Sequence, residues 1–260
     1  MSFYPILCAP GCMGQTTVYN FPPNNWELNF DRTRLVNVTW AEDGVWHSMV
    51  VAELPFGSAR TFSKEDIRPS LPDDTLPLLS LSTEALPEQC LSLPRAMNGT
   101  SIPSWRGTLS LRSTIAETSY QGELDPFPNP GSLLTFGPFI QFGRSVENFM
   151  LFLNLEESPV ARTSIIEVHE GANLSQLKRS IQVRNNSISV LSLDDLDFSI
   201  NSLPVVSCKG MSGIPLYFSK TRDGSFLSIE HTHPPASYVI HGERWGAQKV
   251  IKKKWFDKLA

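Results

Sequence analysis

Apolar and polar residues alternate along much of this chain with a period of two, the spacing that predicts half-buried β-strands. The clearest case is a pair of runs, Val36–Trp40 and Val45–Val51, which are rich in β-branched and aromatic residues. Between them lies Asp43-Gly44, a dipeptide that adopts the positive φ angles of a tight turn. We therefore expect a β-hairpin over residues 36–51.

Further short runs with strand character follow, separated by turn residues such as Asn-Asn, Asp-Gly and Ser-Gly. They are Trp105–Leu111, Leu133–Phe136, Phe149–Leu155, Ser164–His169, Ile181–Arg184, Ser187–Leu193, Val205–Cys208, Phe226–His231 and Ser237–His241. Helical patterns are few: a short stretch that Ser63 caps, residues 173–179, and the C-terminal tail. This spacing predicts an all-β fold, an antiparallel β-sandwich or jelly-roll-like arrangement with few short helices.

Prolines interrupt the segment 69–104, and each proline lacks the backbone donor that a central strand or helix needs. Leucine runs in this segment are too apolar for a solvated linker between two domains. We therefore expect an extended connector with edge strands, packed against the body. The chain is then a single β-rich unit over residues 1–260. Its possible subdivision is an N-terminal hairpin region (1–68), a Pro-rich packed connector (69–104) and a main β-sandwich (105–260).

Composition and charge narrow the function classes. The chain is 41% hydrophobic and 18% charged, which predicts a folded protein, and its net charge of -4 argues against a nucleic-acid partner. We find no apolar run long enough for a membrane span and no export signal at the start, so we expect a cytoplasmic location. The four scattered cysteines do not resemble a disulfide framework, and we expect reduced thiols.

The charge is unevenly distributed, because the last twelve residues carry five lysines against one aspartate. As a helix, this tail would place Ile251, Trp255 and Leu259 on one face and lysines around the rest. Such a helix can dock on its own domain, or it can touch an anionic surface or a partner. The sequence leaves these alternatives open.

The most chemically suggestive stretch is Glu230-His231-Thr232-His233-Pro234-Pro235. On a strand, His231 and His233 point to one face, and His241 could join them from a neighbouring antiparallel strand. Imidazoles gathered in this way can bind a divalent transition metal. The alternative is a stiff structural turn or a ligand-contacting loop, in which case the protein carries no cofactor.

A second stretch, residues 118–131, combines aromatic, amide and acidic side chains with three prolines. We single out Tyr120, Gln121, Glu123 and Asp125 as binding residues, because a rigid loop is a common way to present a binding site. Glu123 and Asp125 could also form a carboxylate pair of the glycosidase kind. The structural alternative is a packed Ω-loop. Arg244 and Trp245 lie ahead of the C-terminal tail and could extend the surface with which the tail touches a partner or an anionic surface.

Two hypotheses follow from these patterns. The first is a non-enzymatic binding or assembly protein that presents its rigid loops, including Tyr120 and His231, to a glycan, peptide or protein partner. The second is a jelly-roll-type enzyme that acts on a small oxygen-rich substrate. Its metal ligands or acid/base groups would be His231, His233 and His241, and its carboxylate would be Glu123 or Glu230. We favour the first hypothesis, because the sequence contains no complete catalytic motif.

Overall fold

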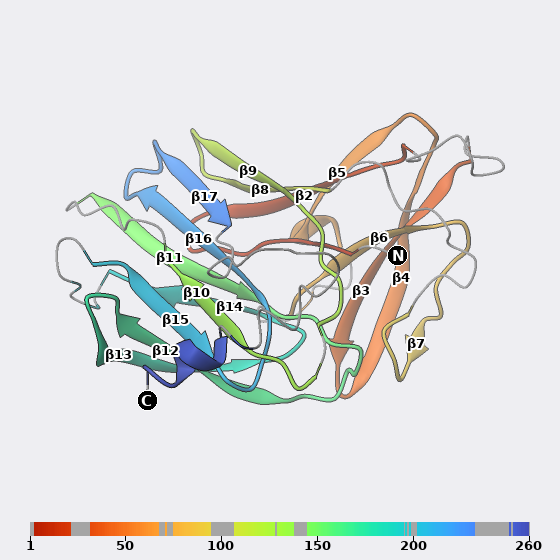
Figure 1. Cartoon of the computed structure of the whole chain (residues 1–260). Helices are drawn as coiled ribbons and strands as arrows, with labels where there is room; N and C mark the ends of the chain where they lie inside the picture. Colours follow the sequence, from red (N-terminus) through yellow and green to blue (C-terminus); the bar gives the residue numbers. More distant parts are fainter. Residues whose placement is uncertain are drawn as a thin grey trace.

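The computed structural model is dominated by β-strands arranged in four sheets (Figure 1). It describes residues 3–21, 32–67, 71, 75–94, 107–127, 129–137, 145–194, 196, 198, 202–231, 250 and 252–259. Every strand pairing within these residues is antiparallel. The predicted all-β, sandwich-like fold class is confirmed.

Two sheets come from the N-terminal half of the chain. In spatial order, the first holds β1 (Tyr4–Pro5), β6 (Leu78–Ser82), β3 (Arg34–Glu42), β4 (Val45–Leu54) and β7 (Gln89–Cys90). The second holds β5 (Ala59–Ser63), β2 (Met13–Tyr19), β8 (Gly107–Arg112) and β9 (Glu117–Gly122). The predicted hairpin is confirmed as β3 and β4, with φ angles of 49° at Asp43 and 76° at Gly44 in its turn.

The C-terminal half forms the other two sheets. The central sheet holds β14 (Ile188–Ser192), β11 (Val146–Leu153), β16 (Ile214–Thr221) and β17 (Leu227–His231). The outer sheet holds β10 (Leu133–Phe136), β15 (Pro204–Cys208), β12 (Thr163–Glu170) and β13 (Asn173–Arg184). In Figure 1 the strands of both sheets run from green to blue, on the side opposite β3 and β4.

The central sheet is buried on both faces, as β11 shows. Phe149, Leu151 and Leu153 belong to the hydrophobic core shared with the N-terminal sheets. Met150 and Phe152 belong to a second core, between the central and outer sheets. Because successive side chains on a strand point to opposite faces, this one apolar run joins the two halves of the molecule.

Two predictions about local structure were wrong. Residues 173–179, expected to be helical, form the first part of β13, because pairing with β12 overrides the helical preference of a Leu-, Gln- and Lys-containing segment. Within the Pro-rich segment, β6 is no edge strand, since it pairs with β1 on one side and β3 on the other. Pro77 immediately precedes it, so the prolines flank this strand.

Helical structure is limited in the described residues. The stretch after Ser63 forms a single 3-10 turn, η1 (Lys64–Asp66), whose Asp66 carboxylate accepts hydrogen bonds from the Ser63 amide and hydroxyl at 2.7 and 2.8 Å. In the C-terminal tail, residues 252–256 are helical, drawn in blue beside β15 in Figure 1. In the part of the chain that the structure describes, no helix has the length and apolar character needed to cross a bilayer.

Candidate functional site

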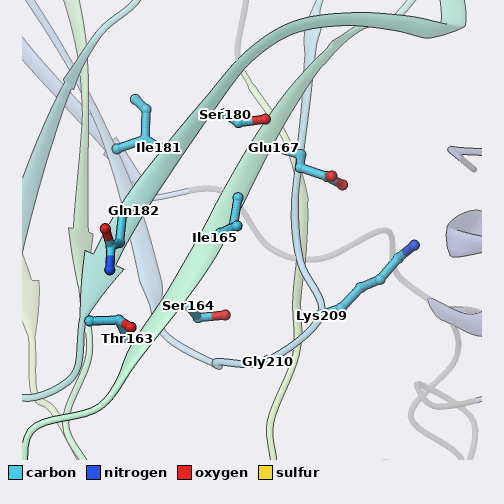
Figure 2. A pocket seen from close by; sticks show the side chains of 9 residues that line it. All are labelled: Thr163, Ser164, Ile165, Glu167, Ser180, Ile181, Gln182, Lys209 and Gly210. Carbon is cyan, nitrogen blue, oxygen red and sulfur yellow. The ribbon is translucent and has the colours of Figure 1, made fainter.

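The outer sheet carries an open hollow on β12 and β13, and its lining includes none of the residues that the sequence singled out for binding. Its volume is ≈ 650 Å³, within the range of small-molecule sites. The lining residues are Thr163, Ser164, Ile165, Glu167, Ser180, Ile181, Gln182, Lys209 and Gly210. Figure 2 shows the Glu167 and Lys209 side chains extending into the same space, from β12 and from the loop that follows β15.

The register of two strands builds the floor of the hollow. Ile165 lies opposite Gln182, and Glu167 lies opposite Ser180. On β12 the residues that alternate with Ile165 and Glu167 are Ile166 and Val168, and both are buried in the second core. Alternation therefore turns Glu167, Ser180 and Gln182, together with Ile165, away from this core, and Ile165 is 56% exposed.

The wall formed by Lys209 and Gly210 is held in place from below. Arg162 Nη1 donates a hydrogen bond of 2.7 Å to the Gly210 carbonyl, and the same guanidinium forms an ion pair with Glu156. The Glu156 residue is only 3% exposed. Gly210 also lies close against the floor, because a Cβ there would come within 2.6 Å of Ser164 Oγ. The wall is thus tied to an ion pair whose carboxylate is buried and whose guanidinium is partly exposed.

Two buried asparagines complete this support. Asn185 Oδ1 accepts the Arg162 amide hydrogen at 2.8 Å, and Asn186 Oδ1 accepts that of Glu156 at 2.7 Å. Asn186 has a φ angle of 52°, a conformation that Asn tolerates better than most residues. The turn after β13 therefore fixes the segment that connects β11 to β12, and with it the position of Arg162.

The C-terminal tail docks on its own domain, next to the hollow. Trp255, Phe256 and Leu259 pack with Leu134 and Val205 of the outer sheet. Of the predicted apolar face, Trp255 and Leu259 therefore contact the sheet, whereas Ile251 lies outside the described residues. One lysine of the tail, Lys252, is half-buried: its Nζ donates to the Ser132 carbonyl at 2.7 Å, and burial lowers its pKa. Lys209 Nζ lies 6.0 Å from the centre of the Phe256 ring, which links this helix to the wall of the hollow.

Of the predicted binding residues, Tyr120 and His231 come together. Their ring centroids are 5.6 Å apart. The turns that precede their strands also touch, since Ser113 Oγ donates to the Gly224 carbonyl at 2.7 Å. Strands β9 and β17 therefore run side by side in the same direction. Tyr120 lies on β9 rather than in a loop, and its ring packs over Gly122.

The remaining members of that stretch point elsewhere. Gln121 is exposed on the opposite face of β9 from Tyr120, because neighbouring strand residues alternate. Glu123 and Asp125 flank Leu124, which is fully buried and bridges to Phe3. Burial raises the pKa of the nearby Tyr4 hydroxyl, and the charges of Glu123 and Asp125 raise it further.

The proposed histidine cluster falls largely outside the described residues. His233, His241, Arg244 and Trp245 all lie there, whereas His231 is half-buried at the end of β17. The described residues contain no group of three or more His, Cys, Asp or Glu side chains that could hold a metal. Metal binding and acid/base catalysis at these histidines therefore stay predictions.

The sequence pattern identified β12 as a strand but not the hollow on it. Most outward residues of β12 and β13 are polar, as on other solvated sheet faces, so composition alone does not mark them. The available signal was Lys209-Gly210 directly after a buried strand, a turn at which a small residue permits close approach. Chemically, the hollow presents hydroxyl, amide, carboxylate and ammonium groups together. Comparisons with protein-family models, curated proteins and solved structures found no match for this chain.

Proposed function

We propose that this chain is a non-enzymatic β-sandwich binding protein that holds one unit of a glycan in the hollow on β12 and β13. The observation that carries the proposal is the hollow itself: ≈ 650 Å³, lined mostly by polar side chains and held in shape by a buried network. The hollow differs from a bare sheet face because charges of both signs, on Glu167 and Lys209, meet there.

The lining suits a hydroxyl-rich ligand. A saccharide hydroxyl both donates and accepts hydrogen bonds, and the hollow supplies hydroxyls from Thr163 and Ser180, an amide from Gln182 and a carboxylate from Glu167. The faces of a sugar ring are C–H groups, and the half-exposed Ile165 gives them an apolar contact. A ligand with polar edges and an apolar face matches this distribution.

The support beneath the hollow favours binding, because the side chains of a preformed site lose little conformational entropy when a ligand binds. The wall carbonyl at Gly210 is bonded to Arg162, and Arg162 is held by Glu156 and Asn185. These residues do not line the hollow, so their role is to position it. We also propose a cytoplasmic location, since all four cysteines are free thiols, the state that a reducing compartment maintains.

The test is titration of the full chain with a panel of monosaccharides and short oligosaccharides, followed by NMR and calorimetry. Gln182→Ala removes a side chain that lines the hollow and should weaken binding about tenfold, the effect of losing ~1.4 kcal/mol of hydrogen bonding. Gln176→Ala is the matched control: Gln176 is exposed on the same strand and does not line the hollow.

Two results would overturn the proposal. One is that no saccharide in the panel binds. The other is that Gln182→Ala has no more effect than Gln176→Ala, whereas Gln121→Ala on β9 removes binding. In that case the ligand would sit near the ends of β9 and β17, where Tyr120 and His231 meet.

A further inference from the structure

Next to the hollow, three polar side chains share the outer face of the outer sheet. Glu167 lines the hollow, and Ser207 on β15 is its directly opposed partner in the strand register. His169 follows Glu167 by two residues on β12, so it points to the same face. Both neighbours of Glu167 are buried: His169 is 3% exposed and Ser207 is 0% exposed.

The hydrogen bonds of His169 fix what its ring can offer. Nδ1 lies 3.0 Å from the Leu174 carbonyl oxygen, which can only accept, so Nδ1 carries the hydrogen. In the neutral ring Nε2 then keeps its lone pair. Nε2 lies 3.7 Å from Glu167 Oε2, so it is aimed at the carboxylate that lines the hollow.

Two buried atoms of this cluster are left without a hydrogen-bond partner among the described residues: His169 Nε2 and Ser207 Oγ. A buried polar atom without a hydrogen-bond partner lowers the stability of the fold. The lost stability is regained when a ligand group that can hydrogen-bond to the atom binds. Nε2 and the Glu167 carboxylate are acceptors, and the Ser207 hydroxyl can donate only one hydrogen. The cluster therefore has a surplus of acceptors and favours a ligand group that donates several hydrogens.

We propose that Glu167, His169 and Ser207 form an inner subsite of the hollow that binds a primary ammonium group, so that the preferred ligand is an amino sugar. This inference rests on the proposed function. An ammonium group donates three hydrogens, one for each acceptor, and its positive charge offsets that of the Glu167 carboxylate. A hydroxyl donates one hydrogen and leaves two of the three acceptors unmatched.

The test compares glucosamine with glucose and N-acetylglucosamine by calorimetric titration of the full chain near pH 6.5, where the amine of glucosamine is largely protonated. Glucosamine should bind about tenfold more tightly than glucose, since a charge-assisted hydrogen bond is roughly twice as strong as a neutral one. N-acetylation should remove this gain, because the amide is neutral and has one hydrogen. The ¹⁵N shift of His169 Nε2 should move on binding glucosamine.

Ser207→Ala and Glu167→Gln should each reduce the preference for glucosamine over glucose. Ser207→Ala removes an unpartnered hydroxyl, so the variant should be at least as stable as the parent chain, and a loss of preference is then not a loss of folding. Ser180→Ala is the matched control: it changes a hydroxyl on the floor of the hollow and should weaken both sugars equally.

The outcomes separate the two proposals. If both sugars bind equally and Gln182→Ala weakens both, the ammonium subsite is wrong and the glycan site stands. If neither sugar nor any other saccharide binds, the proposed function fails as well. If the chain instead binds zinc stoichiometrically and His169→Gln abolishes that binding, the cluster is a metal site and the inference is overturned.

Discussion

The central and outer sheets each contain four antiparallel strands, yet they differ in how they are covered. The central sheet is packed on both faces, between the N-terminal core and the second core. The outer sheet buries one face in the second core, and its other face is covered only in part, where the C-terminal helix packs on β10 and β15. The uncovered part, on β12 and β13, is where the hollow lies.

Because of this difference, the C-terminal half of the chain has one sheet whose side chains serve packing and another with side chains available to contact a ligand. A strand buried on both faces has no side chain available for a ligand, so its residues serve packing. A strand with one solvated face can exchange polar residues there at little cost to stability. Binding residues are therefore expected on the outer sheet, and core residues on β11.

The largest expected effect is in the central sheet. Phe152→Ala should lower the free energy of unfolding by about 3–5 kcal/mol, because Phe152 is 1% exposed in the second core and its loss leaves a cavity. Leu177→Ala on β13 is the contrasting variant. Leu177 is 48% exposed, so Leu177→Ala should lower the free energy of unfolding by less than about 1 kcal/mol. Urea unfolding of both variants measures the difference, and equal losses would contradict the contrast.

The same contrast explains which strands could be predicted from the sequence. The run around Phe149–Leu155 is apolar throughout and was predicted as a strand, in agreement with β11. The first half of β13 was predicted as a helix, because Leu, Gln, Lys and Arg favour helices and few of its side chains are buried. An exposed edge strand carries little hydrophobic signal of its own. Its conformation is set by pairing with β12, which local sequence does not encode.

An intermediate effect is expected where the two sheets are joined. Glu156 lies on the segment between β11 and β12, and Glu156→Ala leaves Arg162 without its ion-pair partner. We expect the free energy of unfolding to fall by about 2 kcal/mol. This is less than the ~3–5 kcal/mol typical of breaking a fully buried ion pair, because the Arg162 side chain is 31% exposed. Saccharide affinity should also fall, because the wall at Gly210 loses its fixed support.

Urea unfolding and saccharide titration measure these two consequences separately. Glu157→Ala is the control, because Glu157 is the exposed neighbour of Glu156. Should Glu156→Ala lower stability and leave saccharide affinity unchanged, the buried network would support folding only. The positioning role assigned to Arg162 would then be wrong.

The candidate site was harder to predict than the fold, for a related reason. Tyr120 and His231 were chosen by residue type, and the structure brings them into contact. The hollow instead depends on register, which sets Glu167 opposite both Ser180 and Ser207. These residues come from three different strands, and a single Glu or Ser on a strand does not by itself indicate a binding site. No motif marks such a set, because its chemistry arises only when the three strands pair.

The smallest expected effect concerns the exposed turn between β16 and β17 of the central sheet. Hydrogen bonds from the Thr221 hydroxyl, and from the amide and hydroxyl of Ser225, lower the pKa of Asp223 from 3.8 to about 2. A carboxyl whose pKa is depressed in the folded state stabilises it above the unfolded pKa, and this stabilisation is lost as the pH falls toward the folded pKa. The relevant window is therefore pH 4 to 2.

Asp223→Asn should lower the melting temperature slightly at pH 6, and the difference from the parent chain should shrink between pH 4 and 2. Scanning calorimetry across this range measures it, with Asp43→Asn in the β3–β4 turn as the control, since Asn suits that conformation as well as Asp does. A difference that persists at pH 2 would assign the effect to turn geometry rather than to charge. The turn would then add nothing pH-dependent to the central sheet, whose stability would come from its two buried faces alone.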